Sequence, residues 1–135
     1  MFAKHKKEAK LFDGMTDIVN KLHSNGCEVY VLSSNSESTI KCVLERYGID
    51  NKIIILRRPS LLGKSGSINK LVKSSKYSKA DVWMIGDEVR DVDAGNKAKV
   101  NTISVSWGLQ DGSLLAQHKP THLVNTVAEL KKLLI

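Results

Sequence analysis

The chain has 135 residues, of which 41% are hydrophobic and 26% charged, and its formal net charge is +7. This length suits one domain with a buried core, and the composition is that of an ordinary globular protein. No apolar run approaches the roughly 20 residues that cross a bilayer, and the basic opening lacks the apolar stretch of a signal peptide. We therefore expect a cytoplasmic protein with no membrane partner.

The positive charge raises the question of nucleic-acid binding, because clustered cations bind phosphate backbones. The basic residues are, however, spread along the chain, and only residues 4–10 contain a run of lysines, with few aromatic residues beside it. A solvated helical face explains this pattern better, which argues against a nucleic-acid partner. Cys27 and Cys42 lie in no metal-binding pattern, and we expect buried, small hydrophobic side chains or inert thiols.

Helical and strand-like patterns alternate along the whole chain. Apolar spacing, isoleucine- and valine-rich runs and glycine stops predict, in order, a helix over 15–22, strand 28–33, helix 40–47, strand 52–56, helix 68–72, strand 81–86, helix 89–99, strand 102–105, strand 122–124 and helix 127–134. Strands separated by helices pair in parallel, and continuous apolar strands fit a sheet that is covered on both faces. The sequence therefore predicts a three-layer, doubly wound α/β fold in a single domain over residues 1–135.

Such folds bind ligands at the carboxyl ends of their strands. One strand runs into Ser33-Ser34-Asn35, another runs into Gly86-Asp87-Glu88 with Asp91 close behind, and Lys64 begins the helix between them. Hydroxyl groups can hold phosphate oxygens, an ammonium group offsets their charge, and carboxylates bind Mg²⁺. These residue types together indicate a phosphoryl-transfer site.

Each residue also has an ordinary explanation. Ser33 can be a helix cap or turn residue, and Lys64 can be a surface lysine. Asp87 can cap the helix that follows it, and Asp91 can be a first-turn acid that the helix dipole favours. The order of the residues, rather than any one of them, indicates the site.

The order resembles the haloacid dehalogenase superfamily. Residues 29–33 resemble its second signature, a hydrophobic strand that ends in serine or threonine; Lys64 resembles the third, and Gly86-Asp87 through Asp91 resembles the fourth, G-D-x-x-x-D. The stretch from residue 93 onward is similar to the phosphoglycolate-phosphatase branch. The resemblance implies a Rossmann-like core, a small phosphorylated metabolite as substrate, and Mg²⁺ as cofactor.

The same resemblance implies a role for each site residue. Ser33 and Lys64 would be catalytic, with Ser33 bonding the transferring phosphoryl group and Lys64 neutralising its charge. The implied phosphate-binding set is Ser33, Ser34, Asn35 and Lys64. Asp87 would bind Mg²⁺, and Asp91 would be a further ligand or its support.

The family's first signature, D-x-D-G-T, which carries the aspartate nucleophile, is not found. Asp13-Gly14 is a poor substitute, because Leu11 stands where the first acid is needed, the charged residues 5–10 argue against a buried strand, and a turn is expected there. Gly63-Lys64-Ser65 imitates the end of a P-loop, but Arg58 stands where its first glycine is required. We therefore reject both readings.

The lost signature also affects the sheet. In the family, that first strand lies between the strands that end at Ser33 and Gly86, so these two must pair directly, leave a gap or accept a strand from elsewhere. We expect a core truncated at its N-terminus, without a cap domain and with very low or no hydrolysis, and we expect homo-oligomers through the open edge. The alternative is a non-catalytic module that binds Mg²⁺ and phosphate or joins an assembly.

Overall fold

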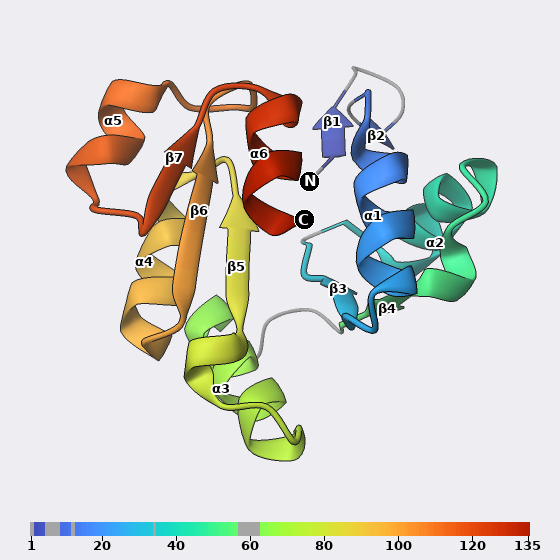
Figure 1. The fold of residues 1–135 in the computed structure, drawn as a ribbon, viewed down its shortest axis with the longest axis horizontal. Coiled ribbons are helices and arrows are strands. Elements are labelled where there is room, and N and C mark those ends of the chain that lie inside the picture. The colour runs from blue at the N-terminus through green and yellow to red at the C-terminus, as the bar shows by residue number, and fades with distance from the viewer. Residues whose placement is uncertain (1, 5–8, 12, 34, 57–62) are drawn as a thin grey trace. The chain divides into compact units, whose positions relative to one another are not determined.

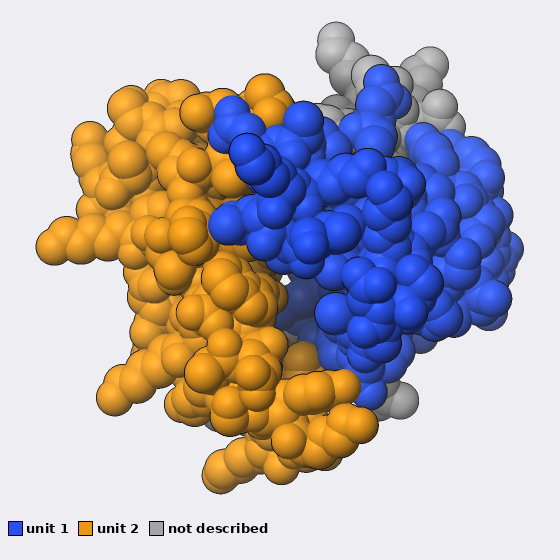
Figure 2. Space-filling view, viewed as in Figure 1, with its two compact units in different colours: residues 1–58, 127–135 blue, residues 59–126 orange. Residues whose placement is uncertain are grey.

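The computed structural model describes residues 2–4, 9–11, 13–33, 35–56 and 63–135. The chain divides into two compact units, the first formed by residues 1–58 with 127–135 and the second by residues 59–126 (Figure 2). A single domain over the whole chain stays a prediction. Each unit is described by itself.

Among its described residues, the first unit holds a parallel strand pair, an antiparallel strand pair and three helices; Figure 1 labels these elements. Its sheets pair β3 with β4 in parallel and β1 with β2 antiparallel. The α2 helix connects β3 to β4, as parallel pairing requires. The elements are β1 (Phe2–Lys4), β2 (Ala9–Leu11), α1 (Met15–Ser24), β3 (Val29–Val31), α2 (Glu37–Arg46), a 3₁₀ turn (Asp50–Lys52), β4 (Ile53–Ile55) and α6 (Val127–Leu134).

Two helices from opposite ends of the chain meet in this unit. Gly14 has a φ of 89°, and a Cβ at this position would lie 2.9 Å from Val127 Cγ1, so glycine suits both the backbone and the space. On the surface, Lys131 Nζ of α6 lies 2.8 Å from Asp17 Oδ2 of α1. The buried face of α1, with Ile18 and Val19 each 1% exposed, is the apolar stripe that the sequence predicts.

The described part of the second unit is a three-stranded parallel sheet in the order β5-β6-β7 with three helices. Trp83 pairs with Asn101 and Gly86 with Ser104, so β5 and β6 end at the same edge. Its elements are α3 (Gly63–Ser74), a 3₁₀ turn (Lys79–Asp81), β5 (Trp83–Gly86), α4 (Val89–Ala98), β6 (Asn101–Val105), α5 (Gly112–Gln117) and β7 (His122–Val124).

The α4 helix packs directly on this sheet because a glycine faces the strands. A Cβ at Gly95 would lie 3.2 Å from Met84 Cβ of β5 and still closer to Thr102 of β6. Val92 and Ala98, 2% and 0% exposed, complete the buried face of the helix. This contact fixes where the first turn of α4 lies relative to the end of β5.

The predicted helix and strand order agrees with the structure, and the parallel sheets confirm the predicted α/β class. Three details differ. The antiparallel pair of β1 and β2 was not predicted. The predicted buried strand at 52–56 exposes 49% of Ile54, since successive side chains point to opposite faces. The short α5 helix was not predicted; Asp111 caps it by accepting a hydrogen bond from Leu114 N–H.

Cys27 and Cys42 are free thiols on the surface, so the first of the two expectations, burial, is wrong, and the second, inert thiols, stays a prediction. In the part of the chain that the structure describes, no helix is long and apolar enough to cross a membrane. Among the same residues β3 pairs only with β4, and β5 pairs only with β6. The arrangement of the strands that end near Ser33 and Gly86 stays a prediction, because these strands belong to different units.

Candidate functional site

A cluster of charged side chains in direct contact with one another lies where β5 ends and α4 begins. Asp91, in the first turn of α4, accepts a hydrogen bond at Oδ2 from Glu88 N–H at 3.2 Å. The Glu88 side chain accepts in turn from the backbone N–H of Asp91, which completes a capping box. Gly86 makes room for this arrangement, because a Cβ there would lie 2.5 Å from Asp91 Cγ.

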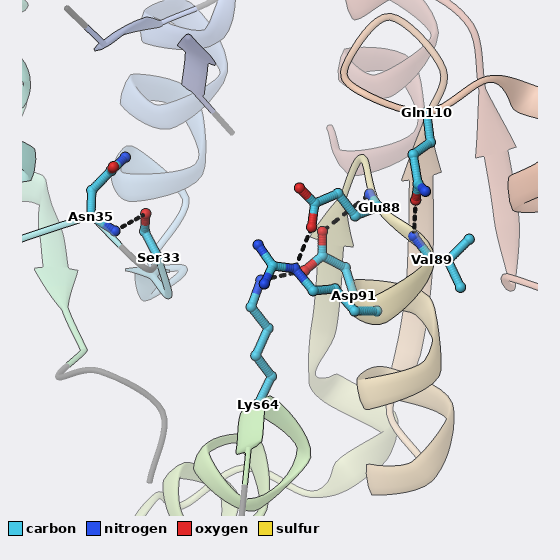
Figure 3. A network of polar contacts seen from close by, with 8 residues as sticks. Ser33, Asn35, Lys64, Glu88, Val89, Asp91 and Gln110 are labelled. Carbon is cyan, nitrogen blue, oxygen red and sulfur yellow. Dashed lines mark hydrogen bonds and ion pairs between the residues drawn. The ribbon is translucent and has the colours of Figure 1, made fainter. Parts of the chain in front are cut away.

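Lys64 reaches this cluster from the first turn of α3, and its ammonium group pairs with Asp91 Oδ1 (Figure 3). The two side chains are 15% and 7% exposed, so the pair is largely shielded from water. A shielded carboxylate with both oxygens engaged is held in one orientation. The structure thus brings together two of the predicted residues, 27 positions apart in the sequence.

Asp87 lies in the same turn but has different partners. Its Oδ2 accepts a hydrogen bond at 2.9 Å from Leu109 N–H, in the loop after β6. Gly108 is required here, because a Cβ at that position would lie 2.7 Å from Asp87 Cγ. No hydrogen bond to Asp87 Oδ1 is found within the described ranges, so this half-buried carboxylate keeps an open oxygen.

Two further contacts involve residues at the start of α4. Gln110 Oε1 accepts a hydrogen bond at 2.5 Å from Val89 N–H, as Figure 3 shows. The Arg90 guanidinium group, 58% exposed, pairs with Glu88. The loop over residues 106–111 was not predicted as part of the site. The only signal available was a glycine placed shortly after a strand end.

The predicted phosphate-binding residues that follow β3 lie in the first unit. Ser33 Oγ accepts a hydrogen bond from Asn35 N–H at 3.1 Å, a local turn of the kind that serine often forms. Ser34 lies outside the described residues. The meeting of Ser33 and Asn35 with Lys64 and the two aspartates stays a prediction.

Hard cations such as Mg²⁺ bind oxygen ligands, and protein sites for Mg²⁺ commonly offer one or two carboxylates with water and substrate phosphate. Asp87 fits this pattern through its open oxygen, whereas Asp91 already has a partner at each oxygen. The described part of the chain holds no group of three or more histidine, cysteine, aspartate or glutamate residues that could hold a metal. A metal here would therefore depend on Asp87 and on oxygens from elsewhere.

Asp13 does not resemble a nucleophile in its surroundings. It is exposed and lies in the turn before α1, as predicted, next to the left-handed Gly14. A covalent nucleophile needs a neighbour that activates it and a phosphate site beside it. Among the described residues, no hydrogen bond or ion pair of Asp13 supplies either one.

The fold and the site together define an α/β protein with a shielded lysine–aspartate pair and an open carboxylate at the end of a parallel strand. The model of the haloacid dehalogenase-like hydrolase family matches residues 2–105. The chain belongs to this family.

Its relatives point to phosphate chemistry without agreeing on a substrate. A phosphoglycolate phosphatase from Synechococcus elongatus is 30% identical over 122 residues, covering 90% of this chain and 58% of that protein. A 5′-nucleotidase from Pseudomonas aeruginosa is 25% identical over 131 residues, covering 94% of this chain and 59% of that protein. The chain thus spans less than two thirds of the length of these relatives.

Solved structures show the same fold. A haloacid dehalogenase-like hydrolase from Streptococcus pneumoniae superposes with a TM-score of 0.80 at 17% identity, over 94% of this chain and 61% of that one. At this identity the likeness establishes the fold alone.

Proposed function

We propose that this chain forms the metal- and phosphate-binding part of a phosphate monoester hydrolase. The observation that carries the proposal is the pair of aspartates at the end of β5, one with an open oxygen and one paired with Lys64, in a chain of this family. A phosphorylated small metabolite is the substrate class, in line with the phosphatase and nucleotidase activities named for its relatives.

In this proposal the two aspartates have different roles. Asp87 would bind Mg²⁺ through Oδ1, and the metal would supply positive charge against the phosphoryl oxygens. Asp91 would be a further ligand or a support for the metal site, because each of its oxygens has one partner and can accept more than one. It holds Lys64 so that the ammonium group faces the same edge of the sheet, where it can offset phosphate charge.

Ser33 would add its hydroxyl group to the phosphate site and Asn35 its side-chain amide, because the Asn35 backbone N–H already donates to Ser33 Oγ. The nucleophile is the missing part, because the D-x-D-G-T signature is not found in this sequence. Loss of a covalent nucleophile typically costs about 10⁴-fold to 10⁶-fold in rate. We therefore expect the chain alone to bind Mg²⁺ and phosphate but to hydrolyse phosphate esters at no more than a trace rate.

The test compares the whole chain with Asp87→Ala and with Asp81→Ala, an exposed aspartate in the same unit that serves as matched control. Mg²⁺ binding followed by titration should weaken by at least about tenfold in Asp87→Ala and stay unchanged in the control. Hydrolysis of p-nitrophenyl phosphate should be no faster for the wild type than for Asp87→Ala.

Equal Mg²⁺ binding in all three proteins would refute the role of Asp87. Mg²⁺-dependent hydrolysis that Asp87→Ala abolishes would mean that the chain has a nucleophile, and Asp13→Asn would then be the next variant. Binding without hydrolysis supports the proposal and leaves the nucleophile to another chain or segment.

A further inference from the structure

We propose that Gln110 is a positioning residue that keeps Asp87 in its metal-binding orientation. It would do so by clamping the loop over residues 106–111 onto the start of α4. This inference rests on the proposed function of Asp87, but the clamp itself can be tested without it.

The clamp begins with the backbone N–H groups at the start of α4. The first turn of a helix leaves N–H groups without partners inside the helix. Here the Glu88 N–H donates to Asp91 Oδ2, and the Asp91 N–H donates to the Glu88 side chain. The Val89 N–H donates to Gln110 Oε1. The acceptor for Val89 thus comes from outside the β5–α4 segment, 21 residues further along the chain.

The same loop holds Asp87 from a second direction. Leu109 N–H, adjacent to Gln110, donates to Asp87 Oδ2 at 2.9 Å. Gly108, adjacent on the other side, lies so close to the Asp87 side chain that no Cβ would fit. Three consecutive residues therefore contact the β5–α4 turn, each in a different way.

These contacts act as a unit. The Gln110 bond fixes the loop relative to the α4 backbone, and the Leu109 bond then occupies one oxygen of Asp87, which leaves Oδ1 as the free one. If the Gln110 bond is lost, the loop loses this tie to the α4 backbone, and Asp87 can rotate more freely. Preorganised ligands bind more tightly because less freedom is lost on binding.

A Gln110 side chain that acted only as an ordinary helix cap would give a different result when it is replaced. If Gln110 only satisfied Val89 N–H, its loss would reduce stability without changing Asp87. The readout must therefore follow Asp87 and Leu109 as well as Val89.

The experiment uses the whole, ¹⁵N-labelled chain and three variants. Gln110→Met keeps the size of the side chain but removes the acceptor, Gln110→Glu keeps an acceptor, and Gln117→Met is the matched control at an exposed glutamine on α5. In Gln110→Met, hydrogen exchange at Val89 should speed up by about tenfold, the equivalent of one lost hydrogen bond. Exchange at the Leu109 amide, which donates to Asp87, should also speed up, and Mg²⁺ affinity should fall by about fivefold.

Gln110→Glu should restore the exchange protection of both the Val89 and Leu109 amides, and Gln117→Met should match the wild type throughout. Faster exchange at Val89 with unchanged exchange at Leu109 and unchanged Mg²⁺ affinity would overturn the clamp and leave Gln110 as a simple cap. If the wild type does not bind Mg²⁺, the proposed role of Asp87 fails. The clamp then stands only if exchange at Leu109 speeds up in Gln110→Met and returns to the wild-type rate in Gln110→Glu.

Discussion

Replacement of Lys64 by methionine would leave the Asp91 carboxylate, 7% exposed, without its cation. Removing one partner of a buried ion pair typically costs about 3–5 kcal/mol, because the remaining charge stays desolvated. The Glu88 N–H still donates to Asp91 in this variant, so we expect the lower end, about 3 kcal/mol of unfolding free energy.

Replacement of the other partner, Asp91→Asn, should lower the unfolding free energy by less. Asparagine keeps an acceptor for Glu88 N–H, and the lysine stem lets its charged tip move towards water. We expect this variant to lose about 1–2 kcal/mol of unfolding free energy. The double-mutant cycle of Lys64→Met and Asp91→Asn should give a coupling energy of about 2 kcal/mol.

Urea unfolding of the four proteins at pH 7, followed by circular dichroism, measures the cycle. The pair of Lys21 with Asp17, 45% and 52% exposed and 3.6 Å apart, is the control, and we expect no measurable coupling there. A coupling below about 0.5 kcal/mol for the Lys64–Asp91 pair would refute the reasoning, because it would place the pair among solvent-screened contacts.

Three other predictions concern packing, charge and capping. Gly86→Ala should lower the unfolding free energy by about 2–3 kcal/mol in urea titrations, because its Cβ would overlap Asp91, whereas Gly112→Ala, whose Cβ would lie 3.4 Å from Ser106 Cβ, should be nearly neutral. The hydrogen bond from Lys131 lowers the pKa of the Asp17 carboxyl, so Asp17 stabilises the fold above its unfolded pKa and loses this effect as pH falls through the folded one. Lys131→Met should therefore raise the pKa of Asp17 in a carboxyl NMR titration and flatten the acid limb of the stability curve; an unchanged pKa would contradict the contact. Ser36→Ala removes the acceptor for Thr39 N–H at the start of α2 and should cost about 1 kcal/mol in thermal unfolding, and a loss of less than about 0.3 kcal/mol would contradict that capping role.

The sequence alone determined the order of most helices and strands, because local patterns carry that information. The stripe over 15–22 and the capping signals around Gly26 and Gly48 depend only on neighbours a few residues away. It also determined the residues at the end of β5, since a buried strand that runs into Gly86-Asp87 leaves polar groups at a sheet edge.

Tertiary structure alone decided how those residues are used. The spacing of Lys64 and Asp91 does not reveal that they pair with each other, because α3 and α4 must first pack in one unit. The part played by Leu109 and Gln110 was also hidden, since a backbone N–H and an amide oxygen acquire a role only when a distant turn comes within hydrogen-bond distance. Local pattern names the candidates, and contacts between segments far apart in the chain decide which carboxylate is engaged and which stays open.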